Sequence, residues 1–328
     1  MTDIDLTGLH HIGLVVHDLG DAIDTFRRIG FHIPPPAYPA LPPAPGAAPE
    51  PVGAGNTHAD FPRNFVELLT VTTAGRTRLP ADATLVPLRI PADRLDATRA
   101  AISHTVSGLA ERVERFEGAH ILIFATDDAE KTAARMAAHG VRHGGVVAAQ
   151  RPISTAEGTS PHPIQYLEIH DTATDAALLP EGRLGVAADL PAALLDAQTG
   201  LDHPNGAVGL AECVLCVEDD DLEATATRYE HYLGFAADRD SSAHAFLLGS
   251  HRLTITTPRG FTARLPGEQP RTPALCAYTI EVADLLAAER LLRARGIPLR
   301  TAATGELFIP AAAACGAAIL LREAKTAV

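Results

Sequence analysis

Four short apolar segments recur along the chain, and each is followed by residues with the spacing of an amphipathic helix. The segments begin LHHIGLVV at residue 9, AHILIFAT at 119, LAECVLCV at 210 and CAYTIEVA at 276. Their length and composition are typical of buried strands, whereas the residues that follow repeat their apolar positions every three or four residues. Each helical pattern ends at a glycine, the residue that most often terminates a helix; these are Gly30, Gly140, Gly234 and Gly296.

Further strands are indicated after each helix. Residues 244–250 and 251–257 have the pattern of a hairpin that turns at Gly249 and Ser250. The first two units each close on a segment that carries a glutamate among apolar residues, FVELL at 65–69 and YLEIHD at 166–171. The sequence therefore predicts a βαβββ unit that is repeated four times.

Three segments stand outside this repeat. Residues 34–51 contain nine prolines, which predicts a partly extended surface loop, or alternatively a lid over a pocket. Residues 91–116 predict a helix that is interrupted near Ser107 and Gly108. Residues 178–206 have turn signals at both ends and a short helical centre. We therefore expect a domain over 1–180, a linker over 181–206 and a second domain over 207–328.

Composition and charge narrow the possible partners. Of 328 residues, 46% are hydrophobic, and the net charge is −13, so the chain lacks the basic surface that nucleic-acid binding requires. No apolar run reaches the roughly 18–20 residues that span a bilayer, which argues against a membrane protein. The N-terminus shows no signal peptide, which predicts a cytoplasmic protein. Cys213 and Cys216 form a C-x-x-C within a strand, where they point to opposite faces and are expected to be reduced core residues.

The repeated pattern also carries candidate chemistry. His11 and His120 lie in the first two opening strands, and Glu67 and Glu168 lie in the two closing segments. A carboxylate among large apolar residues is costly to bury unless it is paired or bound to a cation. Its repetition, each time with a histidine, predicts a metal site formed by all four residues. In a regular strand His11 would share its face with Gly13, and His10 would point to the packed side.

A βαβββ unit that opens on a histidine-bearing strand and closes on a glutamate-bearing strand resembles the vicinal oxygen chelate superfamily, and most of all its glyoxalase-like proteins. The stretches that carry the resemblance are HHIGLVVHDL, GAGNTHADFPRNFVELL, ERFEGAHILIFATDD and RPISTAEGT. It implies an α+β fold in which four modules form two paired-module domains, each an incomplete barrel. It also implies one divalent metal at the centre of such a barrel.

Two histidines and two carboxylates suit Fe, Mn, Zn, Co or Ni. Such a metal would act as a Lewis acid on a small oxygenated metabolite, by isomerisation, lysis or proton transfer. Glu67 or Glu168 could leave the metal and serve as general base. Residues expected to bind substrate, all near these segments, are Asn56, Arg63, Arg151, Tyr166 and His170.

Two other functions stay open. If Glu67 does not bind the metal, His11, His120 and Glu168 would form the facial triad of an extradiol-type iron dioxygenase. The third function is a small-molecule binding protein of the resistance type, which would have a dry apolar cleft and no metal.

The second half departs from the ligand pattern. Aligned by its opening strands, it has Glu212 at the position of His11 and Ala277 at that of His120, with Thr254 near the position of Glu67. We therefore expect it to be structural. Paired-module proteins often share sheet edges, which leaves a homodimer open.

Overall fold

The computed structural model describes residues 5–72, 78–171 and 179–325, and it contains the four predicted strand–helix units. The α+β fold is confirmed. The opening strands are β1 (Leu6–Val15), β7 (Gly118–Thr126), β11 (Ala207–Cys216) and β15 (Ala274–Val282). The helices that follow them are α1 (Leu19–Ile29), α3 (Ala129–Ala138), α5 (Leu222–Leu233) and α7 (Leu285–Ala294).

The helix ends agree with the sequence signals. Asp18 caps α1 by accepting from the backbone N–H groups of Gly20 and Asp21, and Asp128 and Asp284 cap α3 and α7 in the same way. At the other end of α1, Gly30 has a φ of 102°, a left-handed conformation that glycine adopts without strain. The predicted helices are local features, and local residues account for their ends.

In the first half, β1 lies at the centre of a mixed sheet. It runs parallel to β5 (Phe65–Val71) and antiparallel to β7, and β7 runs parallel to β10 (Arg183–Ala188). The sheet continues through β4 (Ala54–Asp60) beyond β5, and through β9 (Gly158–Ile169) and β8 (Val147–Thr155) beyond β10.

This pairing corrects two expectations. The closing strand of the second unit is β10, because β10 takes the place beside β7 that β5 takes beside β1. The glutamate-bearing segment 166–171 instead overlaps the end of β9, one strand further out. Residues 183–188 therefore belong to the first sheet and are not part of a linker; the short helix expected in this region is α4 (Ala192–Asp196).

The second half repeats the arrangement. β11 runs parallel to β14 (His251–Thr256) and antiparallel to β15, and β15 runs parallel to β18 (Ala318–Glu323). The hairpin of β13 (Ala243–Leu248) with β14 confirms the one expected around Gly249. The remaining strands are β12 (Asp238–Arg239), β16 (Arg300–Thr301) and β17 (Leu307–Ile309), and the short helices are η2 (Asp219–Asp221), α6 (Pro258–Arg264) and η3 (Ala311–Ala313).

The proline-rich segment contains two strands, β2 (Ala37–Leu41) and β3 (Glu50–Pro51). β2 pairs with β6 (Thr84–Pro87), and the side chain of Tyr38 is buried, so this part of the segment is built into the fold. After the turn η1 (Ala92–Arg94), α2 (Leu95–Arg115) runs without a break, and the predicted interruption is wrong. Ser107 stays helical and donates to the carbonyl of His104 at 2.8 Å.

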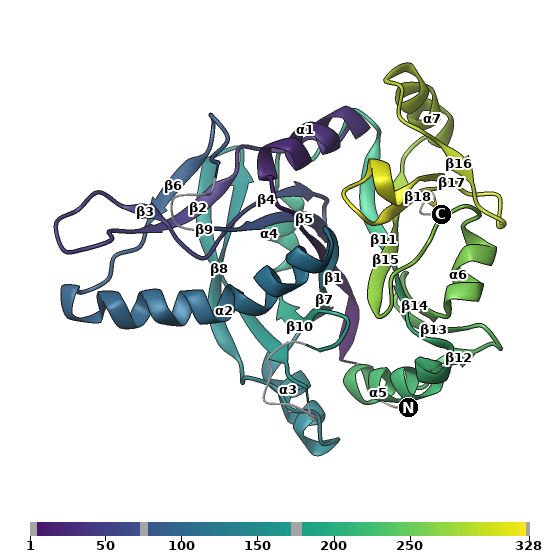
Figure 1. The fold of residues 1–328 in the computed structure, drawn as a ribbon, viewed down its shortest axis with the longest axis horizontal. Coiled ribbons are helices and arrows are strands. Elements are labelled where there is room, and N and C mark those ends of the chain that lie inside the picture. The colour runs from purple at the N-terminus through teal and green to yellow at the C-terminus, as the bar shows by residue number, and fades with distance from the viewer. Residues whose placement is uncertain (1–4, 73–77, 172–178, 326–328) are drawn as a thin grey trace.

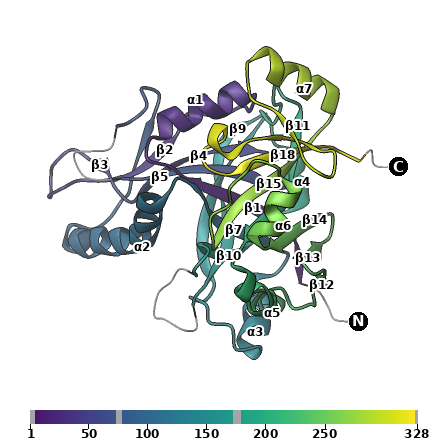
Figure 2. The same cartoon turned by 45° about the vertical axis from the view of Figure 1, so that its right-hand side comes forward.

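One hydrophobic cluster joins the two halves, with members from Leu6 in β1 to Leu321 in β18. Figure 1 shows the first half beside the second, with α1 near α7 at one end of their contact and α3 near α5 at the other; the turned view agrees (Figure 2). Cys213 faces this cluster, whereas Cys216 faces a separate one, as expected for core residues. Within the described residues, no helix is long and apolar enough to cross a membrane.

Candidate active site

A β-bulge brings two adjacent histidines together on β1. Leu9 pairs with Phe124 and His11 pairs with Ile123, so His10 is an extra residue in the ladder between β1 and β7. A bulge turns two successive side chains toward similar directions. The Nδ1 atoms of His10 and His11 consequently lie 2.7 Å apart and share a hydrogen bond. The expectation that His10 points to the opposite face is wrong for this reason.

His10 connects His11 to a buried ion pair. Its Nε2 lies 3.2 Å from Oδ2 of Asp189, and the same carboxylate oxygen accepts a hydrogen bond from Arg151. Arg151 also lies 3.5 Å from Asp60. The sequence analysis did not identify Asp189, because it lies in the segment expected to be a linker.

These contacts select the tautomers of the two imidazoles. Because the Asp189 carboxylate lies nearest to Nε2 of His10, we assign the proton of His10 to Nε2, so that Nδ1 of His10 accepts from Nδ1–H of His11. The Nε2 atom of His11 is left with a free lone pair. It lies 4.0 Å from Oε2 of Glu67, too far for a direct hydrogen bond.

Glu67 is held from two sides. Its Oε1 accepts a hydrogen bond of 2.7 Å from Nδ2 of Asn56 on β4. On the other side, a Cβ atom placed on Gly13 would lie 3.0 Å from Oε2 of Glu67 and 2.9 Å from Cβ of Ile121. Gly13 therefore makes room for the carboxylate.

An aromatic ring supports the cluster. Phe65 stacks on His11 with a centroid distance of 4.4 Å and also contacts His58 at 4.6 Å. The guanidinium of Arg151 lies 4.9 Å from the centre of the Phe65 ring. Phe65 thus contacts both imidazoles and the Arg151 guanidinium, and its stacking fixes the plane of the His11 ring.

The surroundings keep both histidines neutral. Burial lowers the pKa of His11 well below 6.5, and its electrostatic interactions with His10, His58 and Arg151 lower it further. Burial also lowers the pKa of His10, although Asp189 acts against that shift. At neutral pH the exposed-side Nε2 of His11 is therefore an unprotonated base.

The structure brings together two of the four predicted metal ligands, His11 and Glu67. His120 is the extra residue of a second bulge, between Ala119 and Ile121 of β7; it is fully buried, and its Nε2 is hydrogen-bonded to the carbonyl of Phe116 at 3.0 Å. Glu168 accepts from Nε of Arg183 at 3.1 Å, and its charge, like that of Glu67, raises the pKa of the Tyr166 phenol. Among the described residues, no three His, Cys, Asp or Glu side chains are placed to hold a metal ion.

The residues expected to bind substrate are dispersed. Asn56 donates a hydrogen bond to Glu67. Arg151 is 5% exposed, and its guanidinium pairs with Asp189 and Asp60. Tyr166 lies beside Glu168; burial raises the pKa of its phenol, and the negative charge of Glu168 raises it further. Arg63 pairs with Asp196 at the surface.

His170 lies away from His11 and Glu67. Its backbone N–H donates to the carbonyl of Arg142 at 2.9 Å, and a Cβ on Gly144 would contact its ring at 3.3 Å. It therefore packs at the end of β9.

The second half has an ion pair at the equivalent place. β11 carries the same bulge as β1, with Leu210 paired to Ile280 and Glu212 to Thr279, so Glu212 corresponds to His11 as expected. Arg264 of α6 donates to both oxygens of Glu212, at 2.8 and 2.7 Å, and Thr254 donates to Oε1 at 2.6 Å.

The strand register settles two further equivalences. Glu67 pairs with Gly13, and Thr254 pairs with the equivalent Val214, so Thr254 does occupy the position of Glu67. Ala277, however, corresponds to Ile121, and Cys276 corresponds to His120. His120 and Cys276 are the extra residues of equivalent bulges in β7 and β15, whereas the sequence alignment matched the two apolar segments one residue out of step.

A family model confirms the resemblance to the vicinal oxygen chelate superfamily. Within it, the chain belongs to the family described as "Glyoxalase-like domain", which matches residues 9–233. No curated protein matches the sequence.

Solved structures share the fold. A hypothetical protein from Staphylococcus aureus is 12% identical, with 97% of this chain and 99% of that chain covered and a TM-score of 0.58. A fusion of a xylose isomerase-like TIM barrel with 4-hydroxyphenylpyruvate dioxygenase is 11% identical, with a TM-score of 0.52. That match covers 99% of this chain but 50% of the fusion protein. At such identities the similarity concerns the fold alone.

Proposed function

We propose that this chain is an enzyme that transfers a proton on a small oxygenated metabolite, with His11 and Glu67 as the reacting groups. The observation that carries the proposal is the neutral Nε2 of His11, which lies 4.0 Å from the Glu67 carboxylate and is oriented through His10 by Asp189. A base held in one tautomer by a second imidazole and a carboxylate follows the same logic as other oriented histidine bases.

The suited substrate has a C–H bond next to a carbonyl group. Nε2 of His11 would take that proton, and the electron pair would move onto the carbonyl oxygen. Where the deprotonated carbon carries a hydroxyl, Glu67 would pass the hydroxyl proton to the former carbonyl oxygen, and return of the abstracted proton to the former carbonyl carbon completes an isomerisation. Where the next carbon carries a leaving group, re-formation of the carbonyl expels that group with its electron pair and completes a lysis. Both outcomes lie within the reaction types expected from the sequence.

The residues do not fit the four-ligand metal centre. His11 and Glu67 offer two ligands, fewer than the three that catalytic metal sites usually take from the protein, and Nε2 of His120 is bonded to the carbonyl of Phe116. We therefore assign the proton transfer to the side chains themselves. The same positions give no support to a triad of His11, His120 and Glu168 for an oxygenase.

The proposal is tested by solvent exchange. The protein is incubated in D₂O with a panel of small hydroxycarbonyl and dicarbonyl compounds, and loss of the C–H signal is followed by NMR. We expect exchange with at least one compound, and a rate lower by about 10²–10⁴-fold in His11→Gln, the usual contribution of a general base. Glu67→Gln should also be slow, whereas His231→Gln, an exposed histidine in the second half, should match wild type.

The same assay with a chelator addresses the metal. We expect the rate to persist, because the side chains act alone. Loss of exchange on chelation, restored by Zn, Mn or Fe, would instead support the metal-dependent reaction. Equal rates in wild type and both site variants would refute the assignment of His11 and Glu67.

A further inference from the structure

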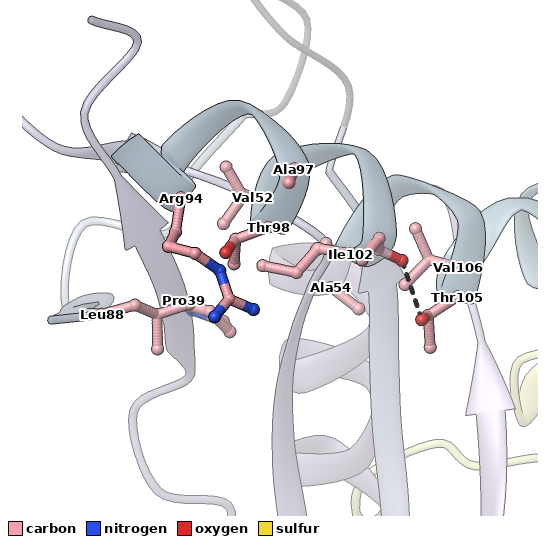
Figure 3. A pocket seen from close by; sticks show the side chains of 12 residues that line it. Pro39, Val52, Ala54, Leu88, Arg94, Ala97, Thr98, Ile102, Thr105 and Val106 are labelled. Carbon is pink, nitrogen blue, oxygen red and sulfur yellow. Dashed lines mark hydrogen bonds between the residues drawn. The ribbon is translucent and has the colours of Figure 1, made fainter. Parts of the chain in front are cut away.

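A second candidate site lies under the N-terminal half of α2. A cavity of about 460 Å³ separates this helix from β2, residues 52–53 and the start of β4, and this volume is within the range of small-molecule pockets. Figure 3 shows side chains of α2 and of the strands facing one another across it. Ala54, which lines the cavity, comes four residues before His58 on β4, about 13 Å along the strand from the site at His11 and Glu67.

The fold holds the helix in place around this space. Arg99 of α2 donates to the carbonyl of Pro42 at 2.6 Å, and Arg183 donates to the carbonyl of Thr105 at 2.6 Å. Further along α2, Leu109 and Val113 pack against the sheet. Between these anchors the helix carries short side chains over the strands, and the cavity remains because they do not fill the gap.

The lining is apolar with one cation. Val52, Leu88 and Ile102 provide its hydrocarbon surface, and Thr98 contributes a hydroxyl. Among the described residues that line it, Arg94 is the charged one, and in Figure 3 its guanidinium reaches over the cavity from the start of the helix. Within the described part of the chain, Arg94 has no ion-pair partner, although the protein carries a net charge of −13 and acidic groups are abundant.

We propose that this cavity binds a small amphipathic carboxylate. The hydrocarbon part would lie on Val52, Leu88 and Ile102, where its burial removes apolar surface from water. The carboxylate would pair with Arg94, whose planar guanidinium suits a carboxylate better than any other cation in proteins. The site is independent of the reaction assigned to His11 and Glu67.

The test uses decanoate below its micellar concentration as the probe, with binding measured by titration calorimetry. We expect saturable binding with one site per chain. Arg94→Gln should weaken decanoate binding roughly fivefold, the size of one exposed ion pair, and should leave the binding of uncharged decanol unchanged. Arg89→Gln removes a neighbouring exposed arginine that does not line the cavity and should bind decanoate as wild type does.

Two further variants locate the ligand. Ala101→Trp places an indole in the cavity and should abolish binding of both compounds, whereas His11→Gln should bind decanoate normally. No binding of decanoate to wild type, unchanged decanoate affinity in Arg94→Gln, or retained binding in a folded Ala101→Trp would each overturn the proposal. Loss of binding in His11→Gln would place the ligand at the first site and would overturn it as well.

Discussion

The Nδ1 atoms of His10 and His11 lie 2.7 Å apart, although the two residues are consecutive in a strand. A regular strand would point them to opposite faces, and the bulge at His10 removes that separation. As a consequence, a buried carboxylate, Asp189, is connected through one imidazole to a second imidazole that faces Glu67. The pair acts as one unit, in which only the outer nitrogen of His11 is free to accept a proton.

Asp189→Asn tests this connection. The asparagine amide can donate to Nε2 of His10, which would reverse both tautomers and place a proton on Nε2 of His11. We expect kcat to fall by roughly 10- to 100-fold, with a small change in KM, because the base is in the wrong protonation form while the binding surface is intact. Exchange kinetics with the compound found in the solvent-exchange assay provide the measurement.

Asp196→Asn is the matched control for that variant. Asp196 is also an aspartate paired with an arginine, but it lies at the surface with Arg63. It should retain the wild-type rate. If Asp189→Asn raised KM and left kcat unchanged, Asp189 would have a structural role only, because the tautomer of His11 affects the chemical step.

Gly13→Ala tests the space beside Glu67. The added methyl would meet Cβ of Ile121 at 2.9 Å and Oε2 of Glu67 at 3.0 Å, so one of them must move. We expect a loss of about 1–3 kcal/mol in stability from overpacking, and a lower exchange rate because Glu67 is displaced from His11. Chemical denaturation and the exchange assay give the two readouts.

Gly209→Ala provides the comparison for Gly13. Gly209 lies on β11, an opening strand like β1, but the nearest atoms to an added Cβ are 3.9 Å away. This variant should be close to wild type in both measurements. A Gly13→Ala protein with full activity would show that the carboxylate need not stay where Gly13 allows it.

The sequence predicts the repeated units well because their signals are local. Aspartate caps, apolar spacing and terminal glycines lie within each helix, and α1 begins and ends where these residues place it. The site is harder to predict because it depends on pairing between distant segments. The bulge at His10 leaves the apolar pattern of β1 unchanged. The strand that pairs with β7 is β10, and the end of β9 lies one strand further out. Glu168 lies near the end of β9, so the sequence pattern suggested a metal ligand where the fold forms an ion pair with Arg183.

The ion pair of Glu212 and Arg264 allows a test of whether the second half has a structural role. Glu212 is 3% exposed and accepts from Arg264, Thr254 and Thr279, so its charge is satisfied. Removing Arg264 leaves a buried charge without a partner, which costs about 3–5 kcal/mol. We expect Arg264→Leu to lose this much stability in urea denaturation, whereas the double variant with Glu212→Leu should recover most of it. Recovery without a change in exchange rate would agree with a structural role; a rate lost in the folded double variant would contradict it.

His120 predicts a pH dependence of stability. Burial lowers its pKa to about 4, with the carbonyl of Phe116 acting against the shift and Arg112 acting with it. The unfolded chain takes up the proton near pH 6.5, so between about pH 6.5 and 4 the unfolded state binds more protons than the folded state. Stability therefore falls as the pH drops through this window, by about 2–3 kcal/mol for this residue at pH 4.5.

His10, His11 and other buried histidines add to the same loss, so the informative quantity is the difference between two proteins. His120→Gln keeps a side-chain donor for the Phe116 carbonyl but cannot take up a proton. We expect the variant to lose about 2–3 kcal/mol less than wild type between pH 7 and pH 4.5 in urea denaturation. Equal losses in the two proteins would mean that His120 is protonated within the fold, and hence that its side chain reaches water. That result would reopen its predicted role as a metal ligand, because a His120 side chain in contact with water is not held at the carbonyl of Phe116.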